Sequence, residues 1–303
     1  MINPVFVEPF DFSTELVLQR ATLACVAVED NRGAHVTVQA FAWSAGRLWL
    51  LAPTESHKVW ALRKQPQIAV TVRFGDHAVI MGGTAELVDV WPPDPQQLFG
   101  RLPLSMGWYL ARNAGITAGI ITDLVTGDLP GLSSRTIICV TPARSITLQA
   151  GHITHTTGAW ADSTEASGAA PTTLDPYTDL FPAPQQSLVR SATTADLGWV
   201  GSEGLLCLPA VVSHGLVSVP QSLVDTVGTS VGGGAITVHQ SLGNRPSRYL
   251  GAMFRGPIGL SIDGNVAIDV ERITWWTGYA SGTVPIPPTP KAAKRTARTT
   301  AKS

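Results

Sequence analysis

Short apolar or alternating segments separated by turn signals fill the first part of the chain after residue 20. Residues 21–28, 34–43 and 47–51 are segments of this kind, and they are separated by DNRG at 30–33 and SAG at 44–46. Such runs, divided by breaks that contain Gly, Asn or Asp, are typical of antiparallel strands joined by tight turns. The sequence therefore predicts an antiparallel meander as the first part of the fold.

A turn followed by a short helix comes directly after this meander. Residues 51–72, LAPTESHKVWALRKQPQIAVTV, have the pattern strand, turn, helix, strand. Thr54 or Ser56 can cap a helix that begins near His57, where free backbone N–H groups and the helix dipole favour an anion. Lys58 adds a positive charge. One interpretation is a phosphate-binding turn; the other is an ordinary helix cap followed by a solvated lysine.

Composition favours a strand-rich body with more than one core. A chain of 303 residues with 44% hydrophobic side chains can bury one large core or two smaller ones, and we expect two. Charged residues are only 14% of the chain, while 29 glycines and 22 prolines suit tight turns and short helices. The expected fold class is therefore mainly β with short helices (α+β).

Charge and targeting signals exclude several classes of partner. The segment 281–303 holds five of the 21 basic residues and no acid, so the rest of the chain is mildly acidic, and nucleic acid is not expected as a partner. No uninterrupted apolar span is long enough for a membrane helix, and the N-terminus lacks the pattern of a secretory signal. We expect a cytoplasmic protein whose cysteines, Cys25, Cys139 and Cys207, are reduced core residues.

Motifs for several catalytic classes are missing. There is no Walker motif and no G-x-G-x-x-G that opens a helix after a strand. The pair His152 and His155 could be half of a metal site, but no Cys, Asp or Glu stands close to it. The structural interpretation of this pair is therefore preferred, and neither a metal site nor a catalytic residue is predicted.

Changes of composition along the chain predict two units. Residues 1–155 form the first, with a helical insertion at 91–131 whose helices are expected at 96–111 and 116–124. Residues 156–185 are rich in Ala, Thr, Ser, Gly and Pro and are predicted to be a linker. The second, degenerate unit covers residues 186–280, and residues 281–303 are predicted to be a disordered basic tail.

The order of elements in the first unit recurs in the second, which indicates an internal repeat. Pro220 stands where Pro53 stands, and AITVH at 235–239 stands where IAVTVR stands at 68–73. Arg255-Gly256 lies near the position of Gly82-Gly83, where a β-bulge or a close backbone approach is expected. Two similar units in one chain can bury against each other the surface that two separate chains would bury on association.

Three motifs carry a resemblance to a known family. The segment TESHKVWALRKQPQIAV is similar to the S-R-K and following helix, ending in N-P-R-V, of the pyridoxamine 5′-phosphate oxidase-like split β-barrel flavoproteins. GGTAELVD resembles their G-x-A-E strand, and RITWWTG resembles their closing segment with an aromatic pair before a glycine. The resemblance covers about two thirds of the chain. It implies two tandem split β-barrels packed as an intrachain pseudo-dimer, and hence a monomer.

The same resemblance implies a cofactor at the interface between the barrels. Thr54, Ser56, His57 and Lys58 would hold its phosphate, and Trp276 would flank its ring. The implied cofactor is FMN, with the deazaflavin coenzyme F-420 as the alternative and haem as a further one. The chain departs from the family because His57 replaces an arginine, residues 36–41 carry no basic side chain, and no arginine follows Trp276 before the tail.

Two functions from different classes follow. The first is a flavin- or deazaflavin-dependent oxidoreductase acting on a small molecule, in which the cofactor supplies the chemistry. The second is a non-catalytic protein that binds a cofactor, haem or another protein. Because the phosphate turn survives only in the first unit and the aromatic pair only in the second, the sequence predicts one composite site per chain instead of two.

Overall fold

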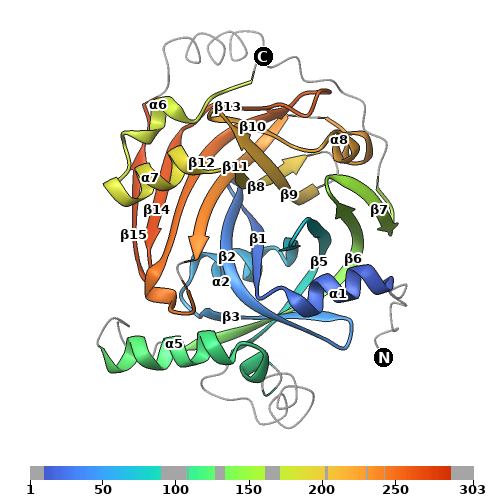
Figure 1. Ribbon diagram of the computed structural model, residues 1–303, viewed down its shortest axis with the longest axis vertical. Coiled ribbons are helices and arrows are strands. Elements are labelled where there is room, and N and C mark those ends of the chain that lie inside the picture. The colour runs from blue at the N-terminus through green and yellow to red at the C-terminus, as the bar shows by residue number, and fades with distance from the viewer. Residues whose placement is uncertain are drawn as a thin grey trace.

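The computed structural model describes residues 10–89, 107, 109–126, 134–160, 171–201, 204–229, 231–241 and 243–287. Strands of two sheets make up most of this part of the chain, and short helices flank them, as Figure 1 shows. The strands coloured blue to green form the first sheet, and those coloured yellow to red form the second. The predicted fold class, mainly β with short helices, is confirmed.

The first sheet closes into a barrel. Its strands pair in the order β3-β2-β1-β4-β5-β6-β7, and β3 also pairs with β6, so that six antiparallel strands form a closed ring. The meander predicted from the sequence and the strand predicted after the turn and helix are both present. The strands are β1 (Leu23–Asp30), β2 (Gly33–Ser44), β3 (Arg47–Pro53), β4 (Gln67–Phe74), β5 (His77–Asp89), β6 (Arg135–Gln149) and β7 (His152–Thr157).

A bulge in the β5–β6 ladder lies at the predicted glycine pair. Gly82 pairs with Arg144 and Gly83 with Pro142, so the extra residue, Ala143, is on β6. The register between β5 and β6 shifts at Gly82 and Gly83. A Cβ on Gly83 would lie 2.2 Å from the carbonyl oxygen of Thr141, so only glycine allows the two backbones to approach this closely.

Helices α1 (Phe12–Arg20) and α2 (His57–Lys64) pack on this barrel. Asp11 caps α1 by accepting the Thr14 backbone N–H at 3.0 Å, and α2 begins at the predicted residue. Buried apolar side chains of α1, α2 and all six barrel strands fill the interior in one cluster, among them Leu18, Val26, Phe41, Val59 and Val70.

The second sheet repeats the strand order of the first. Its order β10-β9-β8-β11-β12-β14-β15 matches β3-β2-β1-β4-β5-β6-β7 position by position. The strands are β8 (Thr194–Gly201), β9 (Gly204–Ser213), β10 (Leu216–Ser218), β11 (Val231–Ser241), β12 (Tyr249–Leu260), β13 (Val266–Ile268), β14 (Arg272–Thr277) and β15 (Ala280–Pro285). Helices α7 (Ala183–Ser191) and α8 (Gln221–Val227) stand in the chain where α1 and α2 stand.

Closure distinguishes the two sheets. In the described part of the chain β10 does not pair with β14, although their counterparts β3 and β6 do pair. A single bridge between Ser218 and Asn265, just before β13, joins the short β10 to that side, and β13 itself pairs with β12. The second unit therefore has the strand order of the first, but among the described residues it does not have the ladder that closes the first barrel.

Several predicted boundaries need correction. The segment predicted as a linker, 156–185, contains the end of β7, helix α6 (Asp175–Thr178) and the start of α7, because Leu174, Phe181 and Leu188 have apolar surface to bury. The predicted tail begins too early, since residues 280–285 form β15 in a ladder with β14. Residues 288–303 lie outside the described part, as does most of the helix expected at 96–111.

Helix α5 (Ala114–Val125) agrees with the helix predicted at 116–124, and it connects the two units. Its buried Asp123 accepts hydrogen bonds from Arg245 Nε at 2.7 Å, from the Ser247 amide at 3.0 Å and from the Tyr279 hydroxyl at 3.2 Å. These partners belong to the second unit, next to the 3₁₀ helix η1 (Pro246–Arg248). None of the helices in the described ranges is long and apolar enough to cross a lipid bilayer.

The two sheets pack face to face through small apolar side chains. Ala27, Val36, Cys207, Ala235 and Met253 belong to one buried cluster, to which both units contribute. The backbones meet most closely at Gly33 and Gly233: a Cβ on Gly33 would lie 2.4 Å from the Gly233 carbonyl carbon. This close packing sets the start of β2 and the hairpin before it against the second unit.

Candidate functional site

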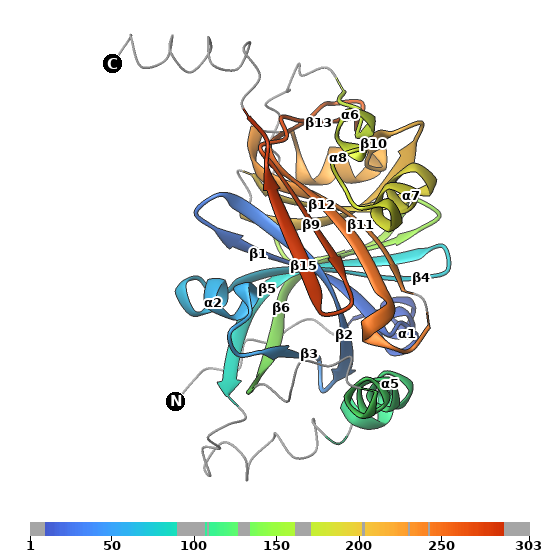
Figure 2. The same ribbon diagram turned by 90° about the vertical axis from the view of Figure 1, so that its left-hand side faces the viewer.

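A cleft of about 410 Å³ lies where the β1–β2 hairpin and α2 of the first unit meet β12, β14 and β15 of the second. Figure 2 shows α2 and this hairpin beside the strands of the second sheet. The size falls in the range of small-molecule sites. Its lining residues are Asp30, Asn31, Arg32, His35, His57, Trp60, Arg255, Arg272, Thr274 and Thr283.

One wall of the cleft is a buried ion pair. Arg255 on β12 donates two hydrogen bonds, at 2.7 and 3.1 Å, to the carboxylate of Asp30 at the end of β1. The side chains are 9% and 3% exposed. Burial alone would raise the pKa of Asp30, but the hydrogen bonds from Arg255 and from the Arg32 amide outweigh it and lower the pKa to about 2. Asp30 therefore carries its charge at neutral pH.

His57 makes the third contact to this carboxylate. Its Nε2 lies 2.8 Å from Asp30 Oδ2, and its side chain is 42% exposed at the first residue of α2. The ring of His35 meets the ring of His57 edge to face, with centroids 4.7 Å apart. Burial, together with the nearby Arg255, lowers the pKa of His35 to about 3, so this imidazole is neutral.

An exposed aromatic side chain on α2 lies next to the histidines. The indole of Trp60 stacks on His57 with ring centroids 5.5 Å apart, and it is 45% exposed. The ammonium of Lys64 lies 3.7 Å from the centre of the indole. An exposed tryptophan beside a cleft is suited to cover a planar ligand.

Arg272 supplies a second guanidinium beside Arg255, on the same face of the second sheet. Arg255 and Arg272 are direct cross-strand partners on β12 and β14, so their side chains leave the sheet on the same face. Like charges in this arrangement repel each other, and Asp30 neutralises only Arg255. Within the described residues no hydrogen bond or ion pair engages the Arg272 side chain. Among the described residues, the Arg272 guanidinium is therefore a cation of the cleft without a paired anion.

The residues predicted from the sequence lie in different places around this cleft. His57 lines it. Ser56 is the N-cap of α2 and accepts the Val59 amide at 3.4 Å, and Thr54 accepts a hydrogen bond from the Thr136 hydroxyl at 3.0 Å. Lys58 is buried, and its ammonium donates to the side-chain oxygen of Gln39 on β2. Burial lowers the pKa of Lys58 to about 7.

Trp276 lies on β14 at the far end of the same strand. Arg272 and Thr274 line the cleft, and Trp276, two residues further on, lines a separate small cavity of about 20 Å³ next to His239. The indole packs over Gly251, where a Cβ would lie 1.9 Å from the ring. The structure thus places His57 and the strand that carries Trp276 on two sides of one interface. The assignment of these side chains to a cofactor stays a prediction.

The equivalent position on the other side of the molecule is occupied by protein contacts. Helix α8 corresponds to α2, and its Ser222 donates a hydrogen bond of 2.8 Å to the carbonyl oxygen of Gly151 in the turn between β6 and β7. Pro220 also packs against Gly151. Where α2 borders a cleft, α8 touches the partner unit directly.

Sequence reasoning missed the residues that give the cleft its charge. Arg255 and Arg272 stand more than 190 positions after His57, and only the pairing of β12 with β14 and the packing of the two units bring them together. Trp60 could have been found, since a tryptophan three residues after His57 on a helix shares its face.

Comparison with known proteins returns solved structures only. No protein-family model matches the chain, and no curated protein matches its sequence. A pyridoxamine 5′-phosphate oxidase-related, FMN-binding protein from Nostoc punctiforme is 15% identical, with a TM-score of 0.36, and the match covers 48% of this chain and 85% of that one.

Two further similar structures have comparable values. A FAD-binding protein from Mesorhizobium loti is 14% identical over 46% of this chain and 94% of its own, with a TM-score of 0.35. An F-420 reductase is 22% identical over 43% of this chain and 94% of its own, with a TM-score of 0.29. Each spans about half of this chain, so the function proposed below rests on the geometry of the cleft.

Proposed function

We propose that this protein binds one phosphate-bearing flavin or deazaflavin per chain in the cleft between its two units, and that it acts as an oxidoreductase on a small molecule. The observation that carries the proposal is the uncompensated guanidinium of Arg272 opposite the aromatic wall of Trp60. A dianionic phosphate and a planar ring are complementary to these two features.

The described residues fit such a ligand in two further respects. Arg272 and Arg32 offer guanidinium donors to a phosphate, and guanidinium–phosphate pairs are among the stronger hydrogen bonds in proteins. The neutral His35 has a buried Nδ1 without a hydrogen-bond partner among the described residues. An unpaired buried nitrogen is costly, and a polar atom of a ligand would satisfy it.

The role of the chain would be to bind and orient. A bound flavin would supply hydride transfer, while Trp60 and His57 cover one face of its ring and Arg272 fixes its anionic end. The Asp30–Arg255 pair holds the wall in place, because it ties the hairpin of the first unit to β12 of the second. The opposite interface, closed by Ser222 and Gly151, supports a stoichiometry of one.

Titration of FMN, and separately of a deazaflavin cofactor, into the purified protein tests this proposal. We expect saturation near one equivalent per chain, followed by flavin fluorescence or calorimetry. Arg272→Ala should weaken binding about ten- to a hundredfold, since it removes charge-assisted hydrogen bonds worth about 1.5 to 3 kcal/mol. The visible spectrum of protein purified without added ligand distinguishes flavin, deazaflavin and haem.

Arg190→Ala is the matched control. Arg190 lies on α7 in an exposed ion pair with Asp179 and does not line the cleft, so its loss should leave affinity unchanged. Equal affinities for wild type and Arg272→Ala would refute the cleft as the phosphate site. Lys58→Ala tests the assignment made from the sequence: a loss as large as that of Arg272→Ala would place the phosphate at the start of α2 instead.

A further inference from the structure

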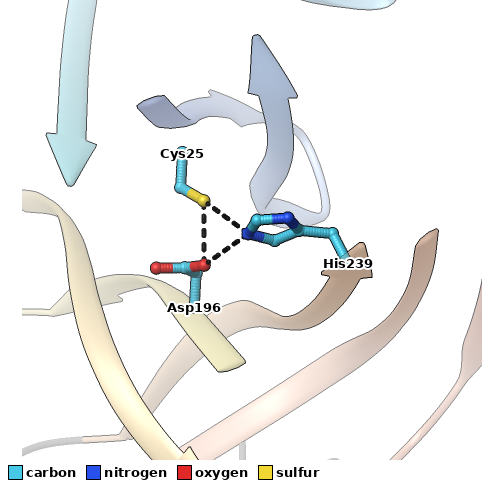
Figure 3. A group of neighbouring side chains, drawn as sticks. All are labelled: Cys25, Asp196 and His239. Atoms are coloured by element: carbon cyan, nitrogen blue, oxygen red, sulfur yellow. Dashed lines mark hydrogen bonds and ion pairs between the residues drawn. The ribbon is translucent and has the colours of Figure 1, made fainter. Parts of the chain in front are cut away.

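Three side chains with metal-binding atoms converge at the interface between the two units, as Figure 3 shows. Cys25 lies on β1 of the first unit, and Asp196 on β8 and His239 on β11 belong to the second. The Cys25 Sγ lies 2.8 Å from Asp196 Oδ2 and 3.3 Å from His239 Nε2, and Nε2 lies 3.3 Å from Oδ2. These residues are far apart in the sequence and form no motif. The prediction from the sequence that there is no metal site did not consider them.

The triangle does not have the geometry of a catalytic relay. In a nucleophile–histidine–carboxylate triad the carboxylate holds one ring nitrogen and the nucleophile contacts the other. Here both Cys25 and Asp196 approach the same nitrogen, Nε2 of His239. One N–H cannot point along both directions. The three potential ligand atoms lie within 3.3 Å of one another, which is close enough for all of them to coordinate one metal ion.

The spacing agrees with a small divalent cation. For a tetrahedral zinc ion, bond lengths of about 2.3 Å to sulfur and about 2.0 to 2.1 Å to nitrogen or oxygen place ligand atoms about 3.3 to 3.6 Å apart. Two of the three separations are 3.3 Å, and the Cys25–Asp196 separation of 2.8 Å is that of a hydrogen bond from the thiol. A metal ion would replace that proton and move the two atoms slightly apart.

A second shell is also present. Arg73 donates a hydrogen bond of 2.8 Å to Asp196 Oδ1, the oxygen that does not face the other two side chains, and it also donates to the carbonyl oxygen of Ala195. Such outer partners orient a ligating carboxylate. A divalent ion with one thiolate and one carboxylate is neutral overall, so Arg73 would not repel the filled site.

A small cavity borders His239, the one member of the triangle among its lining residues. The small cavity of about 20 Å³ that His239 shares with Trp276, Val38 and Leu23 is large enough for about one water molecule. Three protein ligands and one water are the usual set of a zinc site with an open position.

We propose that Cys25, Asp196 and His239 form a binding site for a divalent transition metal ion, zinc by the mixture of sulfur, nitrogen and oxygen donors. One ligand comes from the first unit and two from the second, so the bound metal joins the units. Metal binding thereby stabilises their docked arrangement, because the separated units cannot offer the complete ligand set.

Cobalt(II) titration of the chelator-treated full-length protein tests the site. We expect one equivalent to bind, with a thiolate-to-cobalt charge-transfer band and the visible bands of four-coordinate cobalt, and we expect zinc to displace it. Cys25→Ser should lose the charge-transfer band. His239→Gln, at a partly exposed position, should weaken binding by at least about a hundredfold, since loss of a second-shell partner alone costs about 10- to 100-fold.

Cys207→Ser is the matched control, because Cys207 is an equally buried thiol on neighbouring β9 that lies outside the triangle. It should bind cobalt like the wild type. Far-ultraviolet circular dichroism of each variant verifies folding. A wild type that gives only the spectrum of hydrated cobalt, or a charge-transfer band that survives in Cys25→Ser and disappears in Cys207→Ser, would overturn the proposal.

Discussion

Replacing Arg255 by methionine should destabilise the protein in a pH-dependent way. The substitution keeps most of the apolar volume and removes both hydrogen bonds to Asp30. Asp30 then stays buried with only His57 and the Arg32 amide as partners. Breaking a buried pair from one side typically costs about 3 to 5 kcal/mol, and because two partners remain we expect about 3 kcal/mol near neutral pH.

The pKa of Asp30 gives an independent measure of the ionic part. Its lowering from 3.8 to about 2 corresponds to about 2.4 kcal/mol of stabilisation above both values. A depressed folded-state pKa means that this stability is complete above about pH 4 and disappears as the pH falls through about 2. The difference between wild type and Arg255→Met should therefore shrink by about 1 kcal/mol at about pH 3.

Urea denaturation of both proteins near pH 7 and near pH 3 measures this. Arg190→Met serves as the control, because the Arg190–Asp179 pair has side chains that are 57% and 80% exposed and an exposed pair contributes at most about 1 kcal/mol. A loss below about 1 kcal/mol for Arg255→Met at neutral pH, or the same loss at both pH values, would refute the reasoning.

Three further predictions concern other parts of the molecule. Burial lowers the pKa of Lys58 to about 7, so the unfolded state binds more protons than the folded state between about pH 7 and 10. The thermal stability of the wild type should therefore rise over this pH range, and that of Lys58→Met should not. Parallel profiles of stability against pH for the two proteins would contradict this. Asp123→Ala should lower the free energy of unfolding, measured by chemical denaturation, by about 3 kcal/mol, because it removes the acceptor of the hydrogen bonds from Arg245 and the Ser247 amide. A loss of only about 0.5 kcal/mol, as for a surface substitution, would contradict the role of α5. Sedimentation at micromolar concentration should show one chain per particle, since the halves already pack on each other, and an obligate dimer would refute the intrachain arrangement.

Local signals in the sequence were sufficient for much of the first unit. Turn residues placed the ends of β1 to β3, a capping serine placed α2, and a glycine pair placed the bulge between β5 and β6. These features depend on residues within a few positions of each other. The repeat could be predicted for the same reason, because it is a recurring order of such elements. Strands β8 and β15 were missed, since β8 lacks a clear turn signal before it and β15 lies in a polar segment.

The functional residues depend on contacts that local patterns do not contain. Arg272 faces the cleft because β14 pairs with β12 in one register, and Cys25 meets His239 because two sheets pack face to face. Lys58 is a plain example of the limit: a cation at a helix start suggests an exposed anion ligand, but the side chain is buried against Gln39. Side-chain direction is decided by tertiary packing, not by spacing.

The closed ladder between β3 and β6 has a consequence for synthesis of the chain. Every strand of the first barrel precedes residue 150. The first unit can therefore emerge from the ribosome and form all the hydrogen bonds between its barrel strands before the second unit is synthesised. That unit carries an outward apolar face, Cys25, Ala27 and Val36, whose partners at Cys207, Ala235 and Met253 arrive only later. During synthesis there is therefore an interval in which the folded first barrel exposes this apolar face. In that interval a chaperone, or the first barrel of another chain, can bind the face in competition with the second unit of the same chain.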